Sequence, residues 1–448
     1  MELNREYIDK LKEIIEAGDE EQALKMMESL HAADIADIYD ELSIEEARFL
    51  YLLLDGEKAA DVLIELTDDD RQKFLKVLPS EVIARQFIDN MDSDDAADII
   101  GEMEEERQEE ILSHIDDLEQ AGDIVDLLNY DEDTAGGLMA KELIAVNEEW
   151  SMPTCLKEMR KQAIEVDEVY YIYVVNDSRV LTGVLPLKKM LLSPSVSKVK
   201  HVMKKEPISV KTDTPSEEVA QIIERYDLVA LPVVDGIGRL VGRITVDDVV
   251  DVIREEADRD YQMASGISQD VEASDKVIRL TRARIPWLLI GLFGGVCSAL
   301  VIGLYEGNLH LDHRLAFFIP LIAAMGGNVG IQSSAIIVKD IAAGVNIFDR
   351  TLFKLFKEIS VALINAVILS SLIFSYNFFF NEGVDFALTV SISLFSVIIF
   401  ASLSGTIVPL TLHKLKIDPA LATGPFITTM NDIVGLFIYM TISGQFFG

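Results

Sequence analysis

Apolar residues are distributed unevenly along this chain, and the difference separates two kinds of segment. Downstream of residue 280, five stretches stay apolar for about 20 residues or longer, which is the length a helix needs to cross a hydrocarbon core. The predicted spans are 285–305, 315–338, 359–380, 386–412 and 420–447. We therefore predict a transmembrane domain of five helices over residues 281–448.

The charges between these spans predict which ends face the cytosol. Basic residues precede the first span and fill the second and fourth loops, whereas the first and third loops carry carboxylates and few cations. Under the positive-inside rule, this multi-pass protein of the plasma (inner) membrane has a cytosolic N-terminus and an outer C-terminus. Residues 1–20 lack the apolar core of a signal peptide, which agrees with a cytosolic N-terminus. The deciding residues are Arg282, Arg284, Lys339, Arg350, Lys354, Lys357, His413, Lys414 and Lys416.

The pattern of residues 1–138 predicts short amphipathic helices in which one three-residue motif recurs. Ala-Asp-Ile or a close variant occurs at 33–35, 60–62, 97–99 and 122–124. A repeating unit of one short helix and a turn is typical of an α-solenoid, in which each helix buries its apolar face against its neighbours. We therefore predict a superhelical, α-helical N-domain.

Residues 139–245 change to a different pattern that occurs twice. The segment 139–146 matches 203–210, and each copy continues with a helix, two strands joined by a polar turn, and a second helix. This order resembles a tandem pair of α/β CBS domains. Residues 246–280 follow as an amphipathic connecting helix with an acidic outer face and a linker to the membrane.

The net charge follows the same division of the chain. There are 39 basic and 76 acidic residues, which give a formal charge of −37. Residues 281–448 contain equal numbers of both signs, so the whole excess lies upstream, most of it in 1–138. This excludes a general affinity for nucleic acid, because phosphate binding needs an excess of Lys and Arg. The two cysteines are too few and too far apart for a disulfide framework.

Asp432 is the most informative residue, because it lies near the middle of the fifth span. A carboxylate at the bilayer centre costs about 2.5–3.5 kcal/mol on insertion scales, so it is expected to face protein or water. Gly424, Thr428 and Gly435 share its helix face. Pro425 frees backbone carbonyls one turn earlier. These oxygen donors predict a cation path, and the alternative is a polar contact between two helices.

The second span offers a companion face. Asn328 and Gln332 lie four residues apart on one side of the predicted helix, among glycines that let backbones approach. Helix packing would explain the glycines but not the amides, so we predict that Asn328 and Gln332 line a pore. Oxygen ligands without a His or Cys cluster favour Mg²⁺, Ca²⁺ or Mn²⁺. A single carboxylate per chain suits Mg²⁺, which keeps several of its waters.

Over nearly its whole length the chain resembles the MgtE family of magnesium channels and transporters. The resemblance rests on the acidic helical N-domain, the CBS pair, the acidic connecting helix, the five spans, GGNVGIQSS in the second span and DPALATGPFITTMND in the fifth. Relatives often carry Asn and Ala where this chain has Gly424 and Thr428.

The resemblance implies a homodimer, embedded in membrane lipid, that imports Mg²⁺ down its electrochemical gradient. The second and fifth helices would line a pore on the dimer axis, with Mg²⁺ held at Asp432 of both subunits. Mg²⁺ bound between the cytosolic domains would close that pore through the connecting, or plug, helix.

The acidic surfaces give this regulation a physical basis. Two like charges about 4 Å apart repel by about 1 kcal/mol in water and about 4 kcal/mol at an effective dielectric of about 20, so docking such surfaces calls for divalent cations. Most of these acids are expected to serve solubility alone. The candidate regulatory ligands are Asp94, Asp95, Asp98, Glu217, Asp227, Asp248, Asp251 and Glu256.

The resemblance to CBS pairs also raises the question of a nucleotide. Such pairs often hold the ribose of an adenine nucleotide with a Thr and an Asp three residues later. Thr245 and Asp248 match this in the second repeat, whereas the first repeat has Pro186 and Lys189. A pair that binds ATP as a regulator and a purely structural pair are both compatible with this half-signature.

Two functions from other classes compete with a channel. A membrane Mg²⁺ sensor without transport would leave Asp432 unexplained. An intramembrane aspartyl enzyme needs two carboxylates that share a site, and only one deep aspartate is found. HExxH motifs, nucleophile elbows and P-loops are absent from the sequence, so we do not expect an enzyme.

Overall fold

The computed structural model describes residues 5–164, 166, 169–269, 271, 275–306, 312–342, 351–380, 383–422 and 424–447. The chain divides into two compact units, Met1–Val252 and Ile253–Gly448. The helix α15 (Val246–Ala264) crosses from the first unit into the second. Of the residues used above to orient the chain, Arg350 lies outside the described residues, as does the side chain of Lys354.

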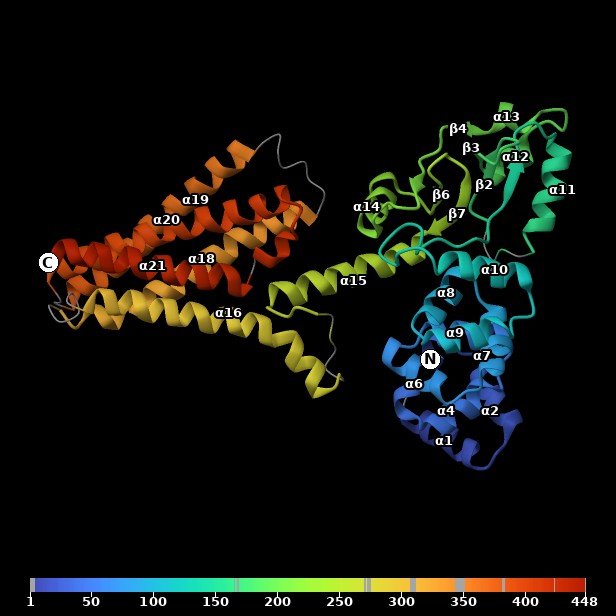
Figure 1. Cartoon of the computed structure of the whole chain (residues 1–448), viewed down its shortest axis with the longest axis horizontal. Coiled ribbons are helices and arrows are strands. Elements are labelled where there is room, and N and C mark those ends of the chain that lie inside the picture. The colour runs from blue at the N-terminus through green and yellow to red at the C-terminus, as the bar shows by residue number, and fades with distance from the viewer. Residues whose placement is uncertain are drawn as a thin grey trace. The chain divides into compact units, whose positions relative to one another are not determined.

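The first unit begins with a stack of short helices that runs from α1 at one end to α10 at the other (Figure 1). Each helix packs mainly on helices two or three positions further along the chain, which confirms the predicted superhelical N-domain. The helices are α1 (Arg5–Glu16), α2 (Glu20–Met27), α3 (Ala32–Ala36), α4 (Ile44–Tyr51), α5 (Gly56–Ile64), α6 (Asp68–Lys76), α7 (Ser80–Gln86), α8 (Ser93–Gly101), α9 (Glu105–Leu112) and α10 (Leu118–Leu127), with 3₁₀ turns at Tyr39–Glu41 and Ile88–Asn90.

Local sequence explains why these helices are short. Several begin at a side chain that accepts a backbone N–H of the first turn, and Ser43 forms a reciprocal capping box with Glu46. Their inner faces bury a continuous core in which Tyr51, Phe74 and Phe87 meet edge to face, with ring centroids 5.2 and 6.0 Å apart. Such helices are stabilised mainly by burying one face against their neighbours.

The CBS repeats form two small sheets. The first has the order β1-β2-β3-β4 and the second the order β5-β6-β7, and each sheet joins a parallel pair to an antiparallel one. The strands are β1 (Ala145–Asn147), β2 (Ile172–Val175), β3 (Leu181–Leu185), β4 (Lys204–Lys205), β5 (Val210–Lys211), β6 (Ala230–Val234) and β7 (Leu240–Thr245). The helices are α11 (Met152–Gln162), α12 (Leu187–Leu192), α13 (Val199–Val202) and α14 (Ser216–Tyr226).

The two repeats contact each other reciprocally through a glycine in each. A Cβ on Gly242 of the second repeat would lie 2.6 Å from Sδ of Met139, in the segment that opens the first repeat. A Cβ on Gly183 of the first repeat would lie 2.7 Å from Sδ of Met203, in the segment that opens the second. A Cβ would also lie 2.9 Å from the backbone oxygen of Ala140 at Gly242 and 2.6 Å from that of Lys204 at Gly183. Because backbone atoms cannot move aside as methionine sulfurs can, a side chain is disfavoured at both matched positions.

Within its described residues, the second unit contains five long helices that lie side by side (Figure 1). They are α16 (Val277–Leu304), α18 (Leu315–Ala342), α19 (Thr351–Phe379), α20 (Val384–Lys414) and α21 (Gly424–Phe447), and a 3₁₀ turn at Pro419–Ala422 precedes the last. Each is long and apolar enough to cross a membrane, as predicted. The helix α19 extends beyond the predicted span 359–380 at its N-terminal end, so Glu358 lies inside a helix.

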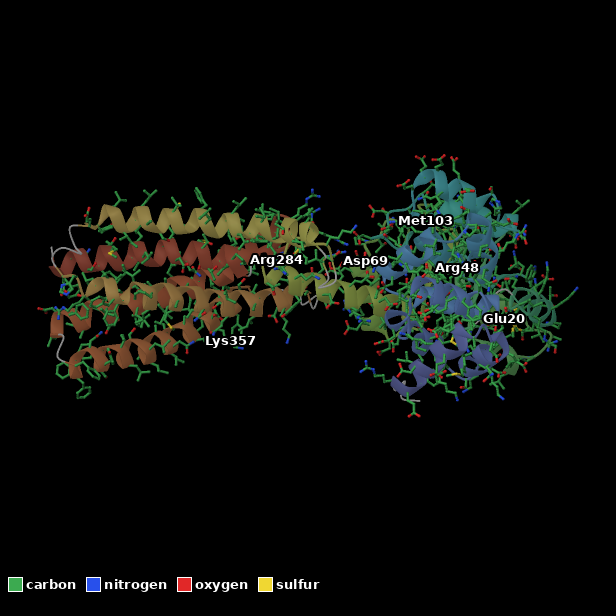
Figure 2. The ribbon with its side chains drawn as sticks, turned by 90° about the horizontal axis from the view of Figure 1, so that it is seen from below. Glu20, Arg48, Asp69, Met103, Arg284 and Lys357 are labelled. Carbon is green, nitrogen blue, oxygen red and sulfur yellow. The ribbon has the colours of Figure 1, made fainter. Side chains whose placement is uncertain are left out.

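Burial differs strongly among the five helices. The most apolar window of α20 is 61% buried, because α20 packs on α18, α19 and α21, whereas that of α16 is 6% buried. The helix α20 is therefore the centre of the bundle, and α16 lies on its outside against α21. Figure 2 labels Arg284 and Lys357, which lie toward the end of the bundle where α16 and α19 begin.

Candidate functional site

Asp432 lies on α21 and is half-buried at the contact with α18. A Cβ on Gly327 of α18 would lie 3.9 Å from Oδ1 of Asp432 and 3.4 Å from Cγ2 of Thr428. Glycine at 327 therefore lets α18 approach the face of α21 that carries the carboxylate. The structure places the glycines of the second span against the face of the fifth span that carries Asp432.

The start of α21 is shaped by Gly424 and Thr428. The Thr428 hydroxyl lies 3.0 Å from the carbonyl oxygen of Pro425 and 3.3 Å from that of Gly424. It therefore donates a hydrogen bond to the carbonyl oxygens of the first turn of α21. Gly424 has φ +47°, and a Cβ there would meet the carbonyl oxygen of Ala264 at the end of α15. The end of α15 thus lies directly against the start of α21.

The remaining predicted pore residues differ in their surroundings. Asn328 and Gln332 are both exposed on α18 within this single chain. Gly435 is buried, and a Cβ there would lie 3.3 Å from Cγ1 of Val397 on α20. The structure thus gives Gly435 a packing contact with α20, and its predicted role in lining a pore stays a prediction.

Asn431, next to Asp432, is a polar residue that the sequence interpretation missed. It is fully buried; its Nδ2 donates to the carbonyl oxygen of Gly326 at 3.3 Å, and its Oδ1 accepts from Ser404 Oγ at 2.8 Å. Asn431 therefore ties α21 to both α18 and α20 one residue before the deep carboxylate. Its position beside Asp432 was the available signal, but sequence alone does not show which neighbours satisfy an amide.

A cluster of carboxylates lies at the start of α8 in the first unit. Asp92, Asp94 and Glu142 each offer one oxygen, and these oxygens lie within 4.8 Å of one another. Ser93 Oγ donates to Oε2 of Glu142 at 2.8 Å and accepts from the backbone N–H of Lys141 at 3.0 Å. Three acids held this closely have the donor set that a hard divalent cation prefers.

Asp95 and Asp248 extend this cluster electrostatically. Burial, followed by the neighbouring charges of Asp95 and Asp248, raises the pKa of Asp94 well above its usual value. Burial and the charge of Asp248 raise the pKa of Asp95 to about 7, with a further contribution from Asp98. Burial also raises the pKa of Asp248. Protons and cations are therefore expected to compete for these carboxylates.

Thr245 and Asp248 bond to each other. The backbone N–H and the hydroxyl of Thr245 donate to Oδ2 of Asp248 at 2.9 and 2.7 Å. The pair thus joins the end of β7 to the first turn of α15, and this contact occupies one oxygen of Asp248. The half-signature for a nucleotide therefore also has a structural role at the start of α15.

The other predicted regulatory acids have different surroundings, although Asp98 still acts on the cluster through its charge beside Asp95. Glu217 and Asp227 are exposed at opposite ends of α14, a helix of 11 residues that is about 16 Å long, so they cannot share one ion within a single chain. Asp98 is exposed on α8, and Asp251 is exposed on α15. Glu256 is half-buried on α15, and Arg259 Nη1 lies 2.8 Å from its Oε1.

Family models match most of the chain. Residues 30–133 match the MgtE intracellular N domain, 135–193 and 199–255 match CBS domains, and 319–442 match the MgtE divalent cation transporter model.

Two curated relatives are similar over most of their length. The magnesium transporter MgtE of Bacillus subtilis is 33% identical over 446 residues, covering 91% of this chain and 98% of the relative. The magnesium transporter MgtE of Thermus thermophilus is 33% identical over 440 residues, covering 97% of both chains.

Two solved structures are similar to slightly more than half of this chain. The cytosolic domain of the Mg²⁺ channel MgtE in complex with ATP aligns with a TM-score of 0.52 and 34% identity, over 55% of this chain and 99% of the other. The soluble part of a magnesium transporter aligns with a TM-score of 0.51 and 27% identity, over 56% of this chain and 98% of the other.

Proposed function

The chain belongs to the MgtE family of magnesium transporters, and from this premise we propose that it imports Mg²⁺ through a pore that cytosolic Mg²⁺ closes. The observation that carries the proposal is the half-buried carboxylate of Asp432, facing Gly327 across the contact of α18 and α21. The proposal has two parts, a cation path at Asp432 and a cation-responsive lock in the acidic unit.

Charge balance favours a homodimer around the cation path. One chain supplies a single deep carboxylate at this contact, whereas Mg²⁺ carries two positive charges, so Asp432 of two subunits would neutralise one ion. Mg²⁺ dehydrates reluctantly and is commonly held by one or two carboxylates with several waters retained. The exposed amides of Asn328 and Gln332 on α18 can accept hydrogen bonds from those waters without adding charge.

The basic residues support a cytosolic location for the end of the bundle where α16 and α19 begin. Arg284 and Lys357 lie toward that end, as Figure 2 shows, and the positive-inside rule places such residues on the cytosolic side. In this orientation the N-terminal acidic unit is cytosolic and samples the Mg²⁺ concentration inside the cell.

The acidic cluster supplies the lock. Without a cation, the acids at the start of α8 repel one another and Asp248. Mg²⁺ bound by Asp92, Asp94 and Glu142 would relieve that repulsion and hold Asp248, which lies in the first turn of α15. The same helix ends at Ala264 against Gly424 of the pore helix, so fixing its start would bias the contact at its end.

ATP is a second candidate regulator. The structure similar to the cytosolic part of this chain holds ATP, and Thr245 with Asp248 matches the ribose-binding half-signature of CBS pairs. Oδ2 of Asp248 accepts from Thr245, which leaves its other oxygen as an acceptor for a ribose hydroxyl.

Mg²⁺ flux into liposomes tests the pore assignment. The wild type is expected to conduct Mg²⁺ and Asp432→Ala to lose at least about tenfold of that flux, because the charge that attracts the ion is gone. Asp385→Asn is the matched control, since Asp385 is an exposed acid in the first turn of α20. Undiminished flux in Asp432→Ala would show that the ion does not pass this carboxylate.

A further inference from the structure

Glu358 of α19 lies inside a membrane-spanning helix and bonds to two neighbouring helices. Its Oε1 accepts from Ser333 Oγ of α18 at 2.6 Å and from Ser402 Oγ of α20 at 2.8 Å. The two hydroxyl oxygens are 3.1 Å apart, and the serines are only 4% and 2% exposed. Three helices of the bundle therefore converge on one carboxyl oxygen.

The contacts of Glu358 need an acceptor more than they need a charge. Each serine hydroxyl carries one proton, and with both protons directed to Oε1 the side chain of Glu358 acts as an acceptor. Among the described side chains, no ion pair of the second unit includes Glu358. Lys357, the preceding residue, is exposed. A carboxylate, a neutral carboxyl and an amide oxygen could all fill this role, whereas an aliphatic side chain could not.

The segment of α18 that Glu358 holds is the one that faces Asp432. Ser333 is tied to α19 and α20 through Glu358, and Gly326, about 10 Å earlier along the helix axis, is tied to α21 through Asn431. Gly327, opposite Asp432, lies between these two ties. The backbone of α18 near the deep carboxylate is thus fixed at two points by neighbouring helices.

We propose that Glu358 is a positioning residue for Mg²⁺ passage, which holds α18 against α20 so that α18 keeps its place opposite Asp432. This inference rests on the proposed cation path at Asp432. If the acceptor is lost, the two buried hydroxyls can still bond to each other, but one hydroxyl proton loses its acceptor, and burying an unpartnered polar group is costly in a bilayer. The helix α18 then shifts or loosens, and the gap between α18 and Asp432 changes with it.

Two substitutions at Glu358 separate geometry from charge in the liposome flux assay. Glu358→Gln removes the charge and keeps an acceptor oxygen, so flux is expected to stay within about twofold of the wild type. Glu358→Leu removes both, and flux is expected to fall about tenfold, the effect of one lost hydrogen bond to a charged group on a two-state equilibrium. Asp385→Asn again controls for loss of an acid from the membrane domain.

The serines provide a second route if Glu358→Leu does not fold. Ser333→Ala and Ser402→Ala each remove one donor, and each is expected to lower flux by a smaller factor, with the double variant approaching Glu358→Leu. Unchanged flux in Glu358→Leu, or in the double serine variant, overturns the proposal. Loss of flux in a folded Glu358→Gln also overturns it, because the charge would then be what matters.

The same assay distinguishes failure of this inference from failure of the proposed function. If the wild type does not conduct Mg²⁺, or if Asp432→Ala conducts normally, the cation path itself is wrong. If Asp432→Ala is inactive while Glu358→Leu conducts like the wild type, only the positioning role of Glu358 is wrong.

Discussion

Replacing Glu142 by glutamine tests the lock, because it removes one charge from the acidic cluster and keeps the contact with Ser93. Glu142 lies within 4.8 Å of both Asp92 and Asp94, measured between carboxylate oxygens. At that separation two unit charges repel by about 1 kcal/mol in water and about 3.5 kcal/mol at an effective dielectric of about 20. All three side chains are partly exposed, and burial also favours the neutral form of Asp94, so we take a value toward the lower limit, about 1–2 kcal/mol for the two pairs together.

We expect the acidic unit of Glu142→Gln to be more compact than that of the wild type in the absence of Mg²⁺, and to gain less protection from proteolysis when Mg²⁺ is added. A change of about 1–2 kcal/mol corresponds to roughly 5- to 30-fold in an equilibrium constant. Glu142→Gln should therefore resist limited proteolysis better than the wild type in Mg²⁺-free buffer, by about that factor in cleavage rate. The Mg²⁺ concentration for half-maximal protection should rise, because one ligand has lost its charge.

The assay uses the full chain in detergent at constant ionic strength, with Na⁺ replacing Mg²⁺ in the reference samples. Asp213→Asn is the matched control, since Asp213 is an exposed acid of the same unit outside the cluster. If Glu142→Gln and Asp213→Asn behave alike, or if Na⁺ protects the wild type as well as Mg²⁺ does, the repulsion argument is refuted.

Three further predictions concern other parts of the chain. The pKa of Asp95 is raised to about 7, so its carboxyl is protonated below that pH. The Mg²⁺ concentration for half-maximal protection should therefore rise as the pH falls from about 8 to about 6. A midpoint that does not depend on pH would contradict this. Ser43→Ala should destabilise the N-domain by about 1 kcal/mol through loss of its capping box, and proteolysis within α4 that matches the wild type would argue against it. Gly424→Ala should displace the end of α15 from α21, since its Cβ would meet the carbonyl oxygen of Ala264; faster cleavage near Gly266 is expected, and an unchanged cleavage rate would disprove the contact.

Regular patterns within one stretch of chain were predictable from the sequence. The five apolar spans and the twofold CBS pattern are confirmed, because hydropathy and strand alternation are local properties. The helix that carries the third span begins before the span itself, since charged residues around Lys357 and Glu358 interrupt the apolar run but not the helical hydrogen bonds. A hydropathy scale treats Glu358 as an isolated charge, because the hydrogen bonds that it accepts from two serines on other helices are not visible in the local sequence.

Contacts between distant segments were only partly predictable. The sequence interpretation selected Asp94, Asp95 and Asp248, which the fold does bring together. It missed Glu142, which lies 48 positions after Asp94 and reaches the cluster only because the backbone N–H of Lys141 bonds to Ser93. Its candidates Glu217 and Asp227 lie at opposite ends of α14, and their role as regulatory ligands stays a prediction. Spacing along the chain does not reveal which distant residues the fold brings into contact.

The central claim is that a cation-responsive lock controls a cation pore in one chain. The most direct test is Mg²⁺ current in membrane patches whose cytosolic face is bathed in rising Mg²⁺. The account predicts that current through the wild type falls as cytosolic Mg²⁺ rises, and that Glu142→Gln needs a higher Mg²⁺ concentration for the same fall. Current that does not depend on cytosolic Mg²⁺, or that responds identically in Glu142→Gln, would contradict the account.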